Sequence, residues 1–271
     1  MPQSDYDREA EAEIERWQRG DESLLRALFD AAMRPVDWLA DRAATPEMLT
    51  QFDAGVEKFV GLLNDASQWT FTDAGILNDA AKHGVAVDDV EALRNVPLEQ
   101  LDPIARAQFD QNAVLAAFQG GGAGLGGIVL IAADLPVLFT LNLRLIQQVA
   151  GTYGFSLRDT EFAPLVLAVF NAAASGQPAA RHQALREINV AAASLAHGHP
   201  YNGHVRGTFS AQNRHVPREI AKNLLGRKLG QMIPIAGAAV GAGVNYWFTT
   251  QTAETAYMLF RALHLECRAR A

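Results

Sequence analysis

The chain has 271 residues, of which 49% are hydrophobic and 20% are charged, and its formal net charge is -7. This length allows one large domain or two small ones, with enough apolar material for a core. The acidic balance excludes a typical non-specific nucleic-acid binder, which presents a basic face. The single cysteine, Cys267, excludes an intramolecular disulfide and a multi-cysteine metal site.

The sequence opens with an acidic and polar stretch, MPQSDYDREAEAEIERW. A secretory signal peptide has the opposite character, with a basic start followed by an apolar core. We therefore expect a cytoplasmic protein. Peripheral association with a membrane would involve the two apolar segments described below.

Capping signals and helical periodicity divide the first part of the chain into helices. Ser4 or Asp5 can cap a first helix that Gly20 ends, and Thr45-Pro46 combines a hydroxyl cap with a proline at the first helical position. The expected helices cover about 5–19, 23–34, 46–63, 73–83, 87–94 and 98–118.

The second part is more apolar and is also helical by pattern. Further helices are expected at 162–174, 179–195, 218–231 and 254–268, with a flexible loop near 196–214. Strand alternation bounded by hairpin signals is missing throughout the sequence. The predicted fold class is therefore all-α, a multi-helix bundle. An acidic N-terminal helical subdomain (1–95) would pack on a helical core (96–271).

Two glycine-rich apolar segments, at 120–150 and 230–265, are predicted to lie in this core. The first could be mistaken for a phosphate-binding loop, but it lacks the Gly-Lys-Ser/Thr ending and a preceding strand. Small residues four positions apart instead allow two helices to approach closely. The glycines with this predicted packing role are Gly120, Gly122, Gly124, Gly126, Gly237 and Gly241.

Asp134 is the only formal charge between Gln111 and Leu143. It could form a buried ion pair with Arg144. It could also cap a helix that begins at Leu135 and Pro136, because aspartate ahead of a first-turn proline is a common N-cap.

A pocket between the two glycine-rich segments is a further hypothesis, because cavities between helices commonly hold ligands. Its polar anchors would be Asp134, Arg144 and Asn245.

The polar stretch at 196–214 contains His197, His199 and His204, which are weak candidates for a metal site. The sequence has neither a His-Glu-x-x-His motif nor a cysteine pattern to support one. We therefore predict no metal and no cofactor.

Residues 123–143 and 229–253 approach the roughly 20 residues that a membrane-spanning helix needs. Each contains proline, many small residues and a polar side chain, which weakens the case for spanning. A buried helical hairpin explains both segments, and a bundle that docks on a bilayer is the intermediate possibility.

The two glycine-rich blocks resemble the EcsC protein family over roughly residues 100–268. In that family a glycine-rich apolar helix leads through Asp-x-Pro to an arginine and then to Tyr-Gly, and a later block reads Ile-Pro-x-x-Gly-x-x-x-Gly with a following asparagine. The matching residues are Asp134, Pro136, Arg144, Tyr153 and Gly154, then Ile233, Pro234, Gly237, Gly241 and Asn245.

The resemblance implies a role near a transporter, because the founding member is encoded beside the subunits of an ABC transporter. The family's biochemical activity is not established. The predicted function is therefore a non-enzymatic accessory or scaffold protein with a membrane surface or a membrane protein as its partner. The alternative is a small-molecule or lipid-binding protein, or a hydrolase, with its pocket between the glycine-rich helices.

Overall fold

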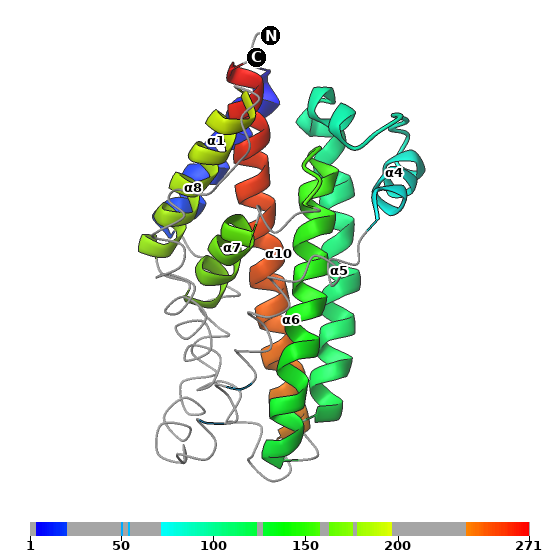
Figure 1. Cartoon of the computed structure of the whole chain (residues 1–271), viewed down its shortest axis with the longest axis vertical. Helices are drawn as coiled ribbons and strands as arrows, with labels where there is room; N and C mark the ends of the chain where they lie inside the picture. The colour runs from blue at the N-terminus through cyan, green and yellow to red at the C-terminus, as the bar shows by residue number, and fades with distance from the viewer. Residues whose placement is uncertain are drawn as a thin grey trace.

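Helices α5, α6 and α10 run side by side through the long axis of the computed structural model (Figure 1). The structure describes residues 4–20, 50, 54, 72–123, 127–157, 163–175, 178–196 and 237–270. Within these ranges the regular elements are all helical, which confirms the all-α prediction. They are α1 (Asp5–Arg19), α4 (Asp73–Lys82), the 3-10 helix η2 (Glu91–Asn95), α5 (Leu98–Ala123), α6 (Gly127–Thr152), α7 (Ala163–Ser175), α8 (Pro178–Ala196) and α10 (Gly237–Arg270).

Helix α1 begins and ends as its capping residues predict. Ser4 and Asp7 form a reciprocal capping box, in which each side chain accepts a hydrogen bond from the backbone N–H of the other. Gly20 ends the helix with a left-handed φ of 83° and donates back to the carbonyls of the last turn. Because both ends are satisfied locally, the limits of α1 are encoded within residues 4–20.

The short helix α4 packs against α5 and α6, and the 3-10 helix η2 contacts α10. Thr72 precedes α4, and Gly84 follows it with a φ of 83°, as predicted. The helix expected at 87–94 is instead a 3-10 turn at 91–95. The predicted helices at 23–34, 46–63 and 218–231 and the predicted loop at 196–214 lie outside the described residues, apart from isolated positions and Ala196.

Helix α6 is continuous through the Asp-x-Pro step. It begins at Gly127, seven residues before Asp134, and encloses Pro136. The prediction that Asp134 caps a helix starting at Leu135 is therefore wrong. A proline in a helix interior removes one backbone hydrogen bond. Packing of the next turn offsets this loss, because Leu138 and Phe139 are buried.

Helix α10 is central to the described fold and packs against α1, α5, α6, α7 and α8 (Figure 1). Phe248 joins it to α6 and α7: its ring stacks on Phe170 at 6.0 Å and meets Phe139 edge-on at 6.2 Å. Aromatic pairs in these geometries add attraction beyond the burial of their surface. Within the described ranges, every helix falls short of the length or apolar character that crossing a bilayer requires.

Candidate functional site: a buried polar network beneath the first helix

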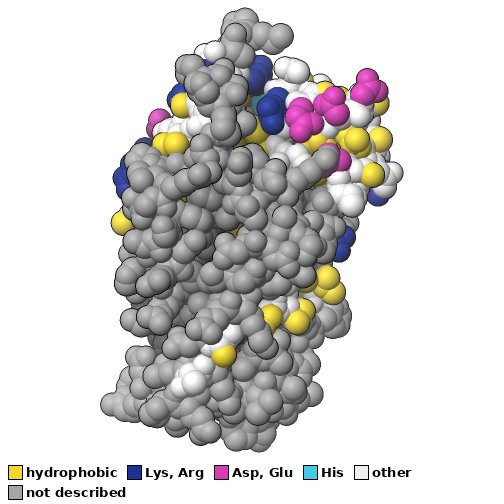
Figure 2. Space-filling view, in the orientation of Figure 1, with side chains coloured by type: hydrophobic (Ala, Val, Ile, Leu, Met, Phe, Trp, Pro, Cys, Tyr) yellow, Lys and Arg dark blue, Asp and Glu magenta, His cyan; other side chains and the backbone are white. Residues whose placement is uncertain are grey.

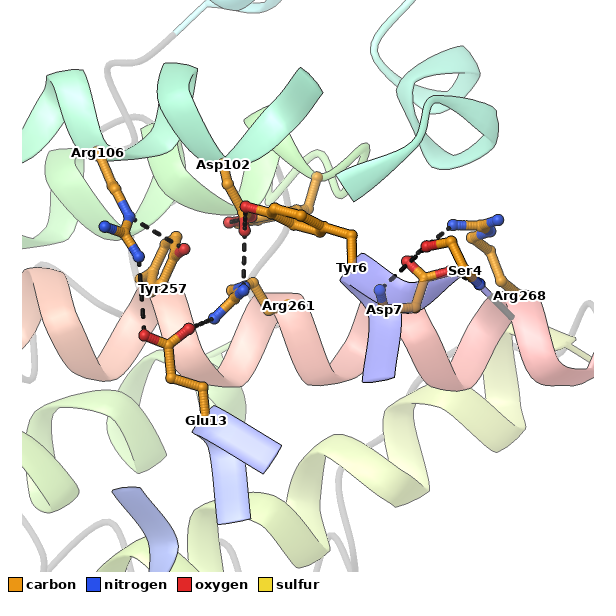
Figure 3. A network of polar contacts seen from close by, with 10 residues as sticks. Ser4, Tyr6, Asp7, Glu13, Asp102, Arg106, Tyr257, Arg261 and Arg268 are labelled. Carbon is orange, nitrogen blue, oxygen red and sulfur yellow. Dashed lines mark hydrogen bonds and ion pairs between the residues drawn. The ribbon is translucent and has the colours of Figure 1, made fainter. Parts of the chain in front are cut away.

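Asp102 is the centre of a polar network that joins α1, α5, α6 and α10 (Figure 3). Asp102 is only 2% exposed. One carboxylate oxygen accepts from the Tyr153 hydroxyl at 2.7 Å, and the other accepts from the Tyr6 hydroxyl at 2.8 Å. The Arg261 guanidinium lies 2.9 Å from that second oxygen. A buried carboxylate needs such partners, because its desolvation is otherwise very costly.

Arg261 extends the network towards α1. Its other terminal nitrogen donates to Glu13 at 2.7 Å. Arg106 lies 3.8 Å from the second Glu13 oxygen and donates to the Tyr257 hydroxyl at 3.1 Å. Both guanidinium groups also lie over the Tyr257 ring, 4.6 Å away for Arg261 and 5.1 Å for Arg106. Glu13 thus links α1 to an arginine on α5 and another on α10.

Two further arginines contact the ends of α1. Arg268 on α10 lies 3.6 Å from Asp7, the same acid that completes the capping box (Figure 3). Arg181 on α8 donates to the Trp17 carbonyl at 2.7 Å and lies 5.2 Å from the Trp17 ring centre. Helix α1 therefore meets arginines from three different helices along its length.

The tyrosines of the network are held in their protonated form. Burial raises the pKa of Tyr6 to about 12, and its hydrogen bond to the Asp102 carboxylate acts in the same direction. Burial, followed by the charge of Asp102, raises the pKa of Tyr153 well above its usual value, and the pKa of Tyr257 rises for the same reasons. At neutral pH the Tyr6 and Tyr153 hydroxyls therefore donate hydrogen bonds to Asp102, and the protonated Tyr257 hydroxyl accepts one from Arg106.

The positive charge at Arg261 is secured by its partners. Burial is the largest single influence and lowers the pKa of this guanidinium, but Asp102, Tyr257 and the hydrogen bond to Glu13 together outweigh burial and raise the pKa above its usual value. The network is therefore a charged one at neutral pH, with the negative groups placed to compensate a buried cation.

His264, one turn after Arg261, is buried and neutral. Its Nδ1 lies 3.4 Å from the Tyr153 carbonyl oxygen, and its Nε2 has no hydrogen-bond partner among the described residues. Burial lowers the pKa of His264 to about 4. This imidazole therefore stays uncharged at neutral pH.

The three predicted pocket residues are differently placed in the structure. Arg144 is exposed and Asn245 is completely buried, while the side chain of Asp134 lies outside the described residues. Asp134 and Arg144 are ten residues apart on one continuous helix, which separates their backbones by about 15 Å. A direct ion pair between them is not compatible with this separation. A pocket between the glycine-rich helices stays a prediction.

A buried hydrogen bond between an amide and a hydroxyl joins α6 and α10, the two helices between which the pocket was expected. The Asn142 amide nitrogen donates to the Leu138 carbonyl at 2.8 Å and to the Thr249 hydroxyl on α10 at 3.1 Å. The Asn142 side-chain oxygen is buried and has no hydrogen-bond partner within the described part of the chain. Buried polar atoms are normally satisfied, so this atom is an exception with an unfilled hydrogen-bonding capacity.

Close packing is documented at two glycines near the C-terminal end of α6. A Cβ atom on Gly151 would overlap the Cδ1 atom of Ile76 on α4. Gly154 has a left-handed φ of 88°, and a Cβ atom there would lie 2.6 Å from the Arg94 backbone nitrogen.

The predicted packing role of the earlier glycines stays a prediction. Four of these positions fall within described helices, Gly120 and Gly122 in α5 and Gly237 and Gly241 in α10. Gly124 and Gly126 lie outside the described residues.

The candidate metal ligands His197, His199 and His204 also lie outside the described residues. Among the residues that the structure describes, no three histidine, cysteine, aspartate or glutamate side chains gather in a way that could hold a metal ion.

Comparison with known proteins identifies the family. The sequence matches the EcsC protein family over residues 8–265, which is nearly the whole chain. The chain belongs to the EcsC protein family. This match includes α1, which the glycine-rich motifs at 100–268 did not reach.

Two relatives from Bacillus subtilis (strain 168) support the assignment. The Uncharacterized protein YdbA is 23% identical over 253 residues, covering 92% of this chain and 89% of YdbA. Protein EcsC is 27% identical over 163 residues, covering 60% of this chain and 63% of EcsC. No solved structure matches the chain.

The network of this EcsC-family protein was not predicted from its sequence, although one signal was available. Asp102 lies within a helical stripe whose other members, Leu98, Leu101 and Ala105, are completely buried. An acid at a core position of an amphipathic helix predicts a buried partner. The identity of that partner was not available, because Tyr6 and Arg261 are far away in the sequence.

Proposed function

We propose that this EcsC-family protein is a non-enzymatic accessory or scaffold protein that docks on a lipid bilayer through one end of its α5–α6–α10 layer. The observation that carries the proposal is the uneven distribution of charge along these three helices. The docking end, called the low-charge end, consists of residues 111–123, 127–143 and 237–253.

The low-charge end contains a single formal charge, Asp134. The remainder of the same helices is charged, with Glu99, Asp102, Arg106 and Asp110 on α5, Arg144 on α6, and Glu254, Arg261, Glu266, Arg268 and Arg270 on α10. On the face drawn in Figure 2 the visible acidic side chains lie in the upper half, most of them near α4, and the few coloured side chains towards the lower end are hydrophobic or uncharged. The charged residues of these three helices are therefore concentrated at the opposite end of the α5–α6–α10 layer.

Exposed apolar side chains support docking at this end. Leu115 and Val114 on α5 are 57% and 51% exposed, Val137 on α6 is 54% exposed and Tyr246 on α10 is 47% exposed. The contact between Phe139 and Phe248 places Val137 and Tyr246 at the same level of the layer. Transfer of such side chains into an apolar environment is favourable, at about 1.5–3 kcal/mol for a fully buried leucine.

The polar network supports a structural rather than catalytic role for the charged end. Asp102 and Arg261 are nearly inaccessible and form an ion pair at 2.9 Å, and burial raises the pKa of Tyr153 beside them well above its usual value. A catalytic acid or base needs an accessible proton and a pKa near the working pH. Burial of Asp102 and Arg261 denies them the first requirement, and Tyr153 meets neither requirement because it is buried and its pKa is raised.

Flotation with liposomes tests the proposal. The purified full chain is mixed with vesicles of neutral phosphatidylcholine and centrifuged through a density gradient. We expect the protein to float, and we expect high salt to leave binding unchanged, because the docking contacts are apolar. A protein that stays at the bottom of the gradient at low and physiological salt would rule out docking on lipid.

A pair of matched variants locates the contact. Leu115→Asp combined with Val137→Asp adds two charges to the low-charge end and should reduce the floated fraction at least tenfold. Gln100→Asp combined with Ala107→Asp adds the same charges at exposed positions on the charged part of α5 and should float normally. Equal flotation of both variants would contradict the proposed surface.

A second candidate function is the binding of a small molecule or lipid between α6 and α10. It is favoured by the unsatisfied, buried side-chain oxygen of Asn142 beside Thr249, a polar anchor of the kind that orients a ligand. Solvent extraction of the purified protein followed by mass spectrometry tests this candidate. A stoichiometric compound that is lost from the Asn142→Leu variant supports it, and extracts without any compound contradict it.

A further inference from the structure

We infer that the surface beneath α1 is a recognition site for an acidic amphipathic helix, which α1 occupies until a partner helix of the same character displaces it. This surface, called the α1-binding surface, is lined by Arg106 of α5, Arg181 of α8, and Arg261 and Arg268 of α10. The inference concerns the charged end of the molecule and does not depend on membrane docking.

The first argument is charge complementarity. Helix α1 contains six acidic residues and three arginines, whereas the surface that it covers presents four arginines. Glu13 contacts two of these arginines and Asp7 contacts a third. The guanidinium of Arg261 is 3% exposed and uses one terminal nitrogen for Asp102 of α5, so its other terminal nitrogen is the one that an acid of the occupant, here Glu13, compensates.

The second argument is that α1 leaves part of the arginine surface unsatisfied. The Nε atom of Arg261 and one terminal nitrogen of Arg268 are buried without a hydrogen-bond partner among the described residues. Asp7 is 3.6 Å from that Arg268 nitrogen, which is an ion-pair distance but too long for a hydrogen bond. An occupant with better-placed carboxylates would gain the charge-assisted hydrogen bonds that α1 does not make.

The third argument is that α1 is a self-contained helix with a small apolar contact. Its capping box and its left-handed Gly20 satisfy its ends without help from the remainder of the protein. Its apolar anchors are Ala10, Ile14 and Trp17, at the spacing by which an amphipathic helix docks in a complementary surface. A partner helix therefore needs one acid ahead of a short apolar stripe and a second acid within it, at the spacing of Asp7 and Glu13.

The test uses a fluorescent peptide with the sequence of residues 4–20, blocked at both ends, added to the full chain. The resident helix is weakened by Glu13→Gln with Ile14→Asn, which leaves all four arginines intact. The matched control is Glu11→Gln with Ala12→Asn on the exposed side of α1. Tethered α1 competes at a high effective concentration, so the unaltered chain and the control should bind the peptide weakly.

We expect the weakened variant to bind the peptide at least tenfold more tightly than the control, with an affinity that falls as salt rises. A peptide with Asp7→Asn and Glu13→Gln should bind at least tenfold more weakly. Adding Arg106→Gln and Arg268→Gln to the weakened chain should have the same effect. A folded weakened variant that ignores the peptide, or that binds the neutral peptide equally well, would overturn the inference.

Hydrogen exchange on the unaltered chain provides a measurement that does not depend on any variant folding. If α1 is releasable, the amides of residues 5–19 exchange faster than those in the middle of α5 and α10. Excess acidic peptide should accelerate them further, because it captures the surface each time α1 leaves. Protection of α1 equal to that of α5, with no effect of the peptide, would show that α1 is a fixed part of the core.

Discussion

Replacement of Asp102 by asparagine removes the negative charge at the centre of the network while keeping the shape of the side chain. Each of its oxygens now accepts, one from Tyr153 and the other from Tyr6 and Arg261. An asparagine presents an N–H donor in one of these two places, where it would face the donors of its neighbours. Arg261 would be left with Glu13 as its remaining ion-pair partner.

Removing one member of a buried ion pair typically costs about 3–5 kcal/mol. Because Glu13 continues to pair with Arg261, we expect Asp102→Asn to lower the free energy of unfolding by about 3 kcal/mol, the lower end of this range. For a chain of 271 residues this corresponds to a fall in Tm of roughly 5 °C.

Urea titration followed by circular dichroism, together with a thermal melt, measures the change. Glu15→Gln is the control, because it removes an acid from the exposed pair with Arg19 and should cost less than about 0.5 kcal/mol. The double variant Asp102→Asn with Arg261→Met removes the buried cation as well and should recover part of the loss. A cost below about 1 kcal/mol for Asp102→Asn, or full additivity in the double variant, would refute the central role of this pair.

Three other predictions concern proton binding and packing. The contribution of Tyr6 and Tyr153 to stability should be constant below pH 10 and fall from pH 10 towards pH 12, because the unfolded chain releases protons that these tyrosines retain in the folded protein. Absorbance at 295 nm should show their delayed ionisation. The contribution of His264 to stability should be fully present above pH 6.5 and should be lost as the pH falls to about 4, a total of roughly 3 kcal/mol. Urea titrations at pH 7 and pH 4 should therefore show a smaller loss of stability in acid for His264→Gln than for the unaltered chain. Gly151→Ala should cost about 1–3 kcal/mol through overlap with α4, whereas Gly243→Ala, with open space around its Cβ position, should gain about 0.5–1 kcal/mol in the same titration.

Each of these predictions has its own contradictory result. Complete ionisation of every tyrosine at pH 10.5 in the folded protein would contradict the protected hydroxyls. An unchanged acid profile in His264→Gln would show that another group governs the loss below pH 6.5. Recovery of Gly151→Ala by Ile76→Val is expected, because valine lacks the overlapping Cδ1 atom, and failure of this rescue would place the strain elsewhere.

The parts of the fold that could be predicted are those whose causes are close in the sequence. Ser4 and Gly20 lie next to the helix ends that they cap, and Gly84 lies next to the helix that it follows. Local signals gave a wrong prediction at Asp134 and Pro136. These residues form a typical N-cap pattern, but they lie inside α6, a helix that tertiary packing stabilises. The outcome at that step depends on contacts between helices, which capping preferences do not contain.

Such local signals could not predict the candidate site. Asp102 is 51 residues from Tyr153, 96 residues from Tyr6 and 159 residues from Arg261, so no periodicity connects them. Burial of Asp102 could be inferred from the apolar stripe around it, but the choice of partner is made only when four helices meet.

The ion pair between Glu13 and Arg261 also has a consequence for synthesis, because the two residues are separated by 248 positions. At the usual speed of about 5–20 residues per second, the ribosome makes Arg261 roughly 12–50 seconds after Glu13. Throughout that interval α1 lacks this cation, and so does the Asp102 region of α5 from the time it is made. The first helix can form early because its caps are local, but its attachment must wait for α10. A nascent chain stalled before α10 would therefore display an acidic helix and an unpaired carboxylate, a state that chaperones or proteases could distinguish from the finished protein.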